Sequence, residues 1–347
     1  MKAQLPDRRE LAGQTGRNAV AGYASRVSVW DPMDRIARLA VTAGRLRIDG
    51  GTVEVLDRFE RVGVGVLLLK GPAIARWLYP QGAERSYVDC DLLVGPADFD
   101  AAGEALRSLG YAKVFDDRRM PRWWREHACE WRRANDGLQV DLHRRLVGVG
   151  VDDEQAWGAL SEDAGEVVVA GRPVPTLALP ARALHVALHA AQHGVRCYQP
   201  IVDLGGALAV GDDDLWRAAA ALAADLHATA AFVAGLRLVP AGQALITRLA
   251  LPHARSVDSE LRASSPPPLA LGFEQLARAP GARARAEIAW RKLVPPPAFI
   301  RHWDPRAADS RVALARAYAR RPLWLLSNAP RGLRAWYRVR RSVERGR

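Results

Sequence analysis

The sequence predicts an α+β fold, in which a mixed β-sheet flanked by helices is followed by a mainly helical C-terminal domain. Short apolar runs of strand length alternate with helical patterns up to about residue 178. From Pro180 to about Ala250 the chain is rich in alanine and leucine and has helical periodicity. A length of 347 residues, at roughly 150 residues per domain, suggests about two domains.

The elements are predicted in chain order from apolar spacing, glycines and prolines. Residues 1–30 form a polar leader. Predicted helices cover residues 31–43, 53–63, 72–79 and 96–109, and predicted strands cover residues 64–69, 88–94, 111–115, 128–132, 138–143, 167–169 and 174–177. The resulting domains are an α+β domain at 31–178, a helical domain at 179–300 and a basic helical tail at 301–347.

Composition and cysteine usage exclude several classes of protein. Hydrophobic residues make up 49% and charged residues 25%, which is the balance of a globular protein. The three cysteines (Cys90, Cys129, Cys197) contain no CxxC pair, so the sequence supports neither a disulfide framework nor a cysteine zinc site. We therefore expect a reducing, cytoplasmic location.

Neither a signal peptide nor a membrane span is predicted. The first twenty residues carry frequent charges and lack the apolar core of a signal peptide. The apolar stretch from Ala218 to Pro240 is interrupted by Asp225, His227 and Arg237. Because charged residues are costly inside a bilayer, we interpret this stretch as packed helix.

The excess positive charge lies in the C-terminal tail. The net charge is +12, and residues 301–347 contribute 13 basic and 3 acidic residues. Trp324, Leu326 and Trp336 are interspersed among these arginines. We favour a terminal helix packed on the protein with a solvated basic side, and contact with an anionic membrane surface or RNA is the alternative.

Three carboxylates are the candidate catalytic and metal-binding residues. Asp89 and Asp91 alternate along one predicted strand, so they share a face, and Asp141 lies on a later strand. Three carboxylates brought close together repel one another unless cations neutralise them, and hard oxygen ligands suit Mg²⁺ or Mn²⁺. The alternative is a pair of exposed strand aspartates with Asp141 lying apart.

A glycine turn provides the candidate phosphate-binding residues Lys70, Gly71 and Arg85. Gly71 follows a predicted buried strand and precedes Pro72, which is favourable as the first residue of a helix. Such a turn presents free amides to an anion, and the Arg85 guanidinium can bind phosphate oxygens. The alternative for Arg85 is a surface salt bridge with Glu84.

Together these motifs resemble a known family. The matching segments are Leu69-Lys70-Gly71, Arg85, Asp89-x-Asp91-Leu92-Leu93-Val94, Leu109-Gly110-Tyr111 and Val140-Asp141-Leu142-His143. They resemble the uncharacterised nucleotidyltransferase family of the polymerase-β-like superfamily over roughly residues 50–210. The resemblance implies a nucleotidyltransferase-like fold and two divalent ions held by Asp89, Asp91 and Asp141. Lys70-Gly71 replaces the usual Gly-Ser or Gly-Gly turn, and 17 residues separate Gly71 from Asp89, which is a longer spacing than usual.

Histidines and one further aspartate are candidate cleft-lining residues. His185, His189 and His193 are spaced to lie along one side of a helix, but the sequence lacks the His-Glu-x-x-His of a zinc protease. Packing or cleft lining is the role expected for these histidines, His189 and His193 included, and metal binding is the alternative. Cleft lining is also expected for His143 on the Asp141 strand. Asp203 is expected either to hold an acceptor or to cap a helix.

These residues predict a Mg²⁺-dependent nucleotidyltransferase that moves a nucleoside monophosphate from an NTP to an acceptor hydroxyl or phosphate. The acceptor is left open among small molecules, peptides and RNA. The alternative is a non-catalytic nucleotide-binding or RNA-binding module that retains the fold.

Overall fold

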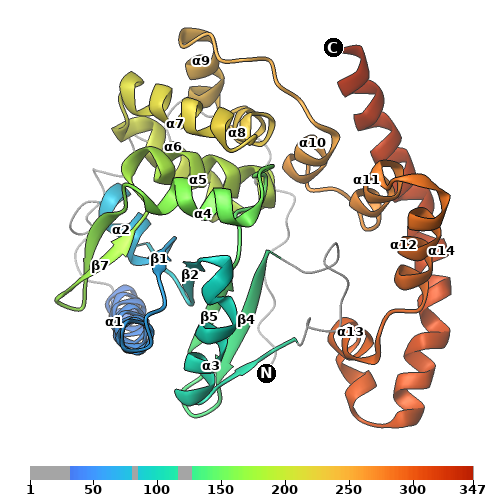
Figure 1. Cartoon of the computed structure of the whole chain (residues 1–347), viewed down its shortest axis with the longest axis horizontal. Coiled ribbons are helices and arrows are strands. Elements are labelled where there is room, and N and C mark those ends of the chain that lie inside the picture. Colours follow the sequence, from blue (N-terminus) through green and yellow to red (C-terminus); the bar gives the residue numbers. More distant parts are fainter. Residues whose placement is uncertain (1–31, 80–84, 116–126, 347) are drawn as a thin grey trace. The chain divides into compact units, whose positions relative to one another are not determined.

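The computed structural model describes residues 32–79, 85–115 and 127–346 (Figure 1). The predicted polar leader, residues 1–30, lies outside this part of the chain. The contacts within the chain separate it into two compact units, one ending at Ala43 and the other beginning at Gly44. The contacts described below are all within residues 44–347.

Seven strands form one mixed sheet. Their bounds are β1 Val66–Leu68, β2 Cys90–Val94, β3 Tyr111–Lys113, β4 Ala128–Arg133, β5 Gln139–His143, β6 Gly165–Val169 and β7 Arg172–Thr176. The order across the sheet is β3-β4-β5-β2-β1-β7-β6. β2 is parallel to β5, and β1 is parallel to β7 but antiparallel to β2. The predicted mixed sheet and all seven predicted strands are thus confirmed, with ends that differ by a few residues.

Helices precede, interrupt and follow the sheet. They are α1 Pro32–Arg61, α2 Pro72–Leu78, α3 Phe99–Ser108, α4 Asp153–Ser161, α5 Leu179–His193, α6 Tyr198–Val210, α7 Asp213–Asp225, α8 Thr229–Leu236, α9 Pro240–Arg248, α10 Val257–Ala263, α11 Ala270–Arg278, α12 Gly281–Leu293, α13 Pro297–Trp303 and α14 Arg311–Arg345, with the short 3₁₀ segments η1 Pro96–Asp98 and η3 Pro305–Ala308. All the regular elements after β7 are helices. This arrangement confirms the predicted helical C-terminal part.

The prediction of two separate helices before the first strand was wrong. A single continuous helix, α1, runs through Gly50 and Gly51, where the apolar pattern is interrupted. Ile48, Val55 and Phe59 of this helix are buried in one core. A β-carbon at Gly51 would lie 2.6 Å from the Leu138 side chain, so the glycine permits close packing that a sequence pattern does not reveal.

A hydrophobic core lies on each face of the sheet. Leu92 and Leu142 belong to the core shared with α1 and α3, whereas Leu93 belongs to the core shared with α5, α7 and α8. Side chains alternate between the faces of a strand. Asp91 and Asp141 therefore lie on the face of the sheet that carries α5.

The stretch from Ala218 to Pro240 is not one helix but parts of α7 and α8 with a turn between them. Among the helices of the described residues, none is both long enough and apolar enough for a bilayer crossing.

Candidate functional site

The strand register brings two of the predicted carboxylates together. Asp91 on β2 is directly opposite Asp141 on β5, its parallel neighbour. One potential ligand atom from each of Asp91, Asp141 and His143 lies within 4.8 Å of the others. Asp89 immediately precedes β2 and is not part of this close group of ligand atoms. Its negative charge still acts on Asp91 and Asp141, so Asp89 is an electrostatic neighbour of the two paired aspartates.

Lys70 provides a partly buried cation next to Asp91. The Leu69 amide donates to the Asp91 carbonyl over 3.0 Å, which places the end of β1 beside β2. The Lys70 Nζ atom lies 2.6 Å from Asp91 Oδ1, and Lys70 is only 16% exposed. Burial opposes the charged form of Lys70, but Asp91 outweighs burial and raises the lysine pKa.

His143 is the second partner of Asp91. Its Nε2 atom lies 3.0 Å from the same Oδ1 atom that Lys70 contacts. The His143 Nδ1 atom is buried and has no hydrogen-bond partner among the described residues. Sequence reasoning assigned His143 only a cleft-lining position, whereas the structure places it in direct contact with a candidate catalytic carboxylate.

The carboxylates differ in how well their charge is compensated. Burial disfavours ionised Asp91, but Lys70 and His143 keep its pKa below the usual range. Burial and the charge of Asp91 raise the pKa of Asp141 to about 6, and the same two causes raise the pKa of Asp89. One lysine therefore does not neutralise three neighbouring aspartates.

This imbalance fits a divalent cation. Asp89 and Asp141 offer hard carboxylate oxygens whose charge is only partly compensated, and oxygen ligands of this kind suit Mg²⁺ or Mn²⁺. His143 adds a nitrogen within the same group, which Mn²⁺ tolerates better than Mg²⁺.

Gly71 forms the turn between β1 and α2. Its φ of +57° lies in a region that side chains disfavour, so glycine suits this position. Pro72 is the first residue of α2, as the sequence predicts, and its missing N–H leaves no donor unpaired. Lys70 is held at the start of this turn, because its carbonyl accepts the Ala73 amide over 3.2 Å.

Arg85 is engaged by Asp203 and does not form a surface salt bridge. The Arg85 Nε atom lies 3.0 Å from Asp203 Oδ1, and Nη2 lies 2.7 Å from Oδ2. Arg85 is 5% exposed and Asp203 is 2% exposed. The alternative partner, Glu84, lies outside the described residues. Asp203 is therefore not a helix cap, because it lies within α6 and binds a buried arginine.

Two residues that sequence reasoning missed complete this buried cluster. Tyr79 donates its hydroxyl to Asp203 over 2.7 Å, and Gln199 donates to both Tyr79 and Asp203 over 2.8 Å. Burial and Asp203 raise the pKa of Tyr79, which keeps the phenol protonated. The four-residue spacing of Gln199 and Asp203 on α6 could have indicated their contact, because side chains at this spacing are neighbours on a helix. The contacts of α6 with Tyr79 and Arg85 span 118 residues or more and leave no such pattern in the sequence.

Two of the three α5 histidines face the carboxylate site. His185, His189, His143 and Lys70 line one small cavity, together with His127 and Gln192. His193 is exposed near the C-terminal end of α5 and does not line this cavity. The sequence gave no indication of His127, whose ring lies 5.5 Å from that of His143 and whose Nε2 lies 3.2 Å from the Gln192 amide nitrogen.

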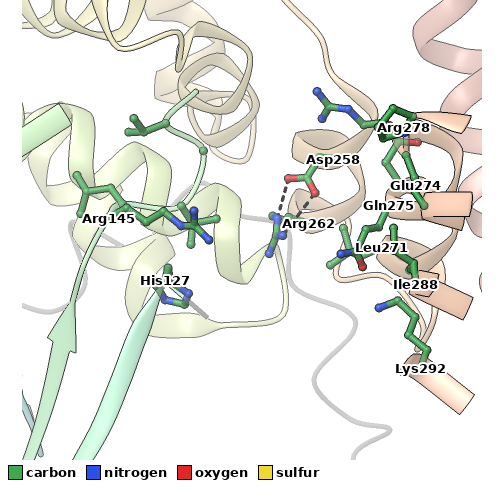
Figure 2. A pocket seen from close by; sticks show the side chains of 18 of the residues that line it. His127, Arg145, Asp258, Arg262, Leu271, Glu274, Gln275, Arg278, Ile288 and Lys292 are labelled. Carbon is green, nitrogen blue, oxygen red and sulfur yellow. Dashed lines mark hydrogen bonds and ion pairs between the residues drawn. The ribbon is translucent and has the colours of Figure 1, made fainter. Parts of the chain in front are cut away.

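A larger pocket adjoins this small cavity. Its volume is about 960 Å³, and it is lined by the segment after β5 together with α10, α11 and α12. Figure 2 shows His127 and Arg145 on one side and Leu271, Ile288 and Lys292 on the other. His127, Leu146 and Val147 line both the pocket and the small cavity. The pocket is large enough for a small-molecule ligand.

Comparison with known protein families decides the classification. The family described as uncharacterised nucleotidyltransferase matches residues 35–241, which is more than half of the chain. The chain belongs to this family. The family resemblance predicted from the Lys70-Gly71 turn and the aspartates is thereby confirmed.

Similarity to solved structures is weak. A solution structure of the antibiotic-resistance factor ANT(2'')-Ia has 17% identity and a TM-score of 0.37, and the match covers 50% of this chain and 90% of that chain. The lincosamide antibiotic adenylyltransferase LnuA, bound to lincomycin, has 16% identity and a TM-score of 0.32, with 46% and 95% covered. An antigenic nucleotidyltransferase-like protein from Paracoccidioides brasiliensis has 14% identity and a TM-score of 0.32, with 54% and 94% covered. No curated protein matches the chain.

Proposed function

We propose that this family member is an active, divalent-cation-dependent nucleotidyltransferase that moves a nucleoside monophosphate from an NTP to an acceptor hydroxyl or phosphate. The observation that carries the proposal is the pairing of Asp91 with Asp141 on neighbouring parallel strands, next to Asp89. Among the carboxylates of the described residues, Lys70 contacts Asp91 alone, so the charges of the neighbouring Asp89 and Asp141 are left in excess, and an NTP is normally bound together with a cation.

Asp89, Asp91 and Asp141 would hold Mg²⁺ or Mn²⁺, with His143 next to them. A divalent ion bound there supplies positive charge that neutralises the triphosphate and the charge developing at the reacting phosphorus. Asp141 is the candidate acceptor of the proton that the attacking hydroxyl loses.

Lys70 and Gly71 are the proposed phosphate-binding residues. The Lys70 ammonium is carried on a flexible four-carbon stem, so it can exchange Asp91 for a phosphate oxygen without backbone movement. The Gly71 turn lets the backbone approach the triphosphate closely, since no β-carbon projects from it.

Arg85 has a more restricted proposed role than the sequence suggested. Its Nε and Nη2 atoms bind Asp203, so a phosphate oxygen would have to bind Nη1. Arg85 also contributes positive charge near the site, since it offsets part of the rise in the pKa of Asp89 that burial and Asp91 cause. Asp203 is buried and has three partners, which favours a structural role over direct contact with an acceptor.

The acceptor is proposed to bind in the pocket of Figure 2, because His127 joins this pocket to the cavity next to Asp91. The predicted helical domain, residues 179–300, would then close one side of the cleft through His185 and His189 of α5. We also propose a reducing, cytoplasmic location, with which the lack of any disulfide among the cysteines of the described residues agrees.

One observation favours a second candidate function, a nucleotide-binding module without catalysis. Asp91 Oδ1 already contacts both Lys70 Nζ and His143 Nε2, so the central carboxylate has partners without a metal ion. A protein that keeps this arrangement when nucleotide binds would recognise an NTP but not transfer from it.

Turnover and binding measurements on matched variants separate these functions. Wild type, Asp91→Asn and Asp141→Asn would be incubated with each NTP, Mg²⁺ or Mn²⁺ and a metabolite extract as acceptor source, and pyrophosphate release measured. We expect the rate of both variants to be at least 100-fold lower than that of wild type. The rate of the exposed control Asp100→Asn should be less than twofold lower.

Wild-type rates that survive both substitutions would contradict the catalytic assignment. If nucleotide raises the melting temperature of wild type but no NTP yields pyrophosphate, the binding module is the correct function.

A further inference from the structure

The solvent face of the C-terminal helix α14 carries a continuous apolar strip. Leu323 is 68% exposed and Leu326 is 70% exposed, whereas large aliphatic side chains usually prefer burial. Val312, Leu333 and Tyr337 are also exposed, at spacings that place all five on one side of the helix.

The opposite face of α14 is packed against the protein, so the exposed strip faces solvent. Arg321 donates to the Lys292 carbonyl over 2.9 Å, and Trp336 donates to Glu274 over 2.8 Å. Gly332 approaches Pro268 so closely that a β-carbon would lie 2.6 Å from the Pro268 carbonyl oxygen. Val343 is buried near the end of the helix.

Arginines flank the apolar strip. The 35 residues of α14 include ten arginines and one glutamate. Arg316, Arg331, Arg334, Arg338 and Arg341 are exposed, and no carboxylate of the described residues forms an ion pair with any of these five. Their positive charge is thus available to an anionic partner.

We propose that this face of α14 binds the surface of an anionic lipid bilayer, with the helix lying in the plane of the membrane. A helix of this length extends about 50 Å at 1.5 Å per residue. Exposed leucines can enter the boundary between headgroups and acyl chains, while arginines alongside them contact anionic headgroups. A partner of this face must offer an apolar layer to the leucines and negative charge to the arginines, and an anionic bilayer surface offers both.

Two other partners fit the surface less well. RNA would satisfy the arginines, but it offers phosphates and base faces to aliphatic side chains such as Leu323 and Leu326, which gain little from either. A second copy of α14 would cover the leucines, but it would bring two rows of arginines together. Of these three partners, the lipid surface alone complements both the charge and the apolar strip.

Vesicle co-sedimentation tests the proposal with the full chain. The vesicles contain phosphatidylcholine alone or phosphatidylcholine and phosphatidylglycerol at about 7:3. One variant carries Leu323→Gln, Leu326→Gln and Leu333→Gln, and another carries Arg334→Gln, Arg338→Gln and Arg341→Gln. A control carries Arg61→Gln, Arg196→Gln and Arg283→Gln, which removes the same charge from exposed positions elsewhere.

Wild type is expected to bind the anionic vesicles at least tenfold more tightly than the neutral ones. Each α14 variant should lose at least tenfold of this affinity, and the control should change by less than threefold. The substituted side chains are exposed, so melting temperatures should stay near that of wild type. The proposal is overturned if wild type does not bind anionic vesicles, or if the leucine variant binds them as wild type does. Tight binding of an RNA oligonucleotide that the leucine variant retains would likewise overturn it and assign the face to RNA.

A labelled protein gives a second readout if the leucine variant does not fold. Leu326→Cys in a Cys197→Ser background would carry an environment-sensitive fluorophore. Its emission should shift to the blue with anionic vesicles, while a label at Gly158→Cys on α4 should not shift. An unshifted emission at position 326 would contradict insertion of this face.

Discussion

At the scale of single residues, Arg85 and Asp203 form a buried ion pair that does not include the candidate metal-binding carboxylates. Both side chains are buried, and the pair is bidentate. Breaking a buried ion pair by removing one partner is costly, because the other charge remains buried without compensation. The pair therefore links the segment before β2 to α6.

Asp203→Asn should destabilise the protein by about 3 to 5 kcal/mol, because the Arg85 charge would lose its partner. Tyr79→Phe, which removes one hydrogen bond to the same carboxylate, should cost only about 1 kcal/mol. Denaturant unfolding measures both changes. The buried pair has no stabilising role if Asp203→Asn costs less than Tyr79→Phe.

At the scale of elements, close approach of backbones fixes the packing of α5 against α8. A β-carbon at Gly235 on α8 would lie 2.0 Å from the Ala187 carbonyl oxygen on α5. Since that atom belongs to backbone, the neighbour cannot move aside cheaply. α5 also carries His185 and His189, so its position affects the site.

Gly235→Ala should therefore lower the free energy of unfolding by several kcal/mol, through overpacking that shifts α5 or α8. Gly158→Ala on α4 is the matched control, because no atom lies within 4 Å of its β-carbon position. That substitution should stabilise the protein by about 0.5 to 1 kcal/mol, since alanine favours helix. Equal thermal stability of the two variants would contradict this account of the packing.

At the scale of elements, the sequence predicted the strands that carry the carboxylates but not the contacts between distant segments. The alternation of Asp89 with Asp91 and the apolar runs around Asp141 predict strands that bring carboxylates to one face, and the parallel register of β2 and β5 confirms this for Asp91 and Asp141. Asp89 precedes β2 and has no place in that register. The partner of Arg85 is 118 residues away and belongs to a helix whose docking no local pattern encodes. His127 had no periodic signal, and the close packing of Gly51 on α1 against Leu138 joins positions that are distant in sequence.

At the scale of the whole molecule, buried histidines make stability depend on pH. Burial, with the charge of Lys70 and His143, lowers the pKa of His185 to about 3, and burial lowers that of His127 to about 3. The unfolded chain, where the histidine pKa is near 6.5, binds more protons between these values. Stability is therefore complete above pH 6.5 and decreases as the pH falls toward 3.

His185→Gln removes one such titration while keeping an amide donor. At pH 4.5 the linkage for one histidine is worth up to about 2 to 3 kcal/mol relative to pH 7.5. The loss of unfolding free energy between pH 7.5 and 4.5 should therefore be smaller in His185→Gln than in wild type by roughly this amount. Identical losses in denaturant titrations at the two pH values would show that His185 is not buried in its neutral form.

Asp89, Asp91 and Asp141 are proposed to hold a divalent cation together, next to the triphosphate. Diffraction from crystals grown with Mn²⁺ and a non-hydrolysable NTP, recorded where manganese scatters anomalously, tests this most directly. We predict an anomalous peak within coordination distance of the Asp91 and Asp141 carboxylates, with the Lys70 ammonium moved from Asp91 to a phosphate oxygen. Clear density for the nucleotide without such a peak, and with Lys70 still bound to Asp91, would contradict it.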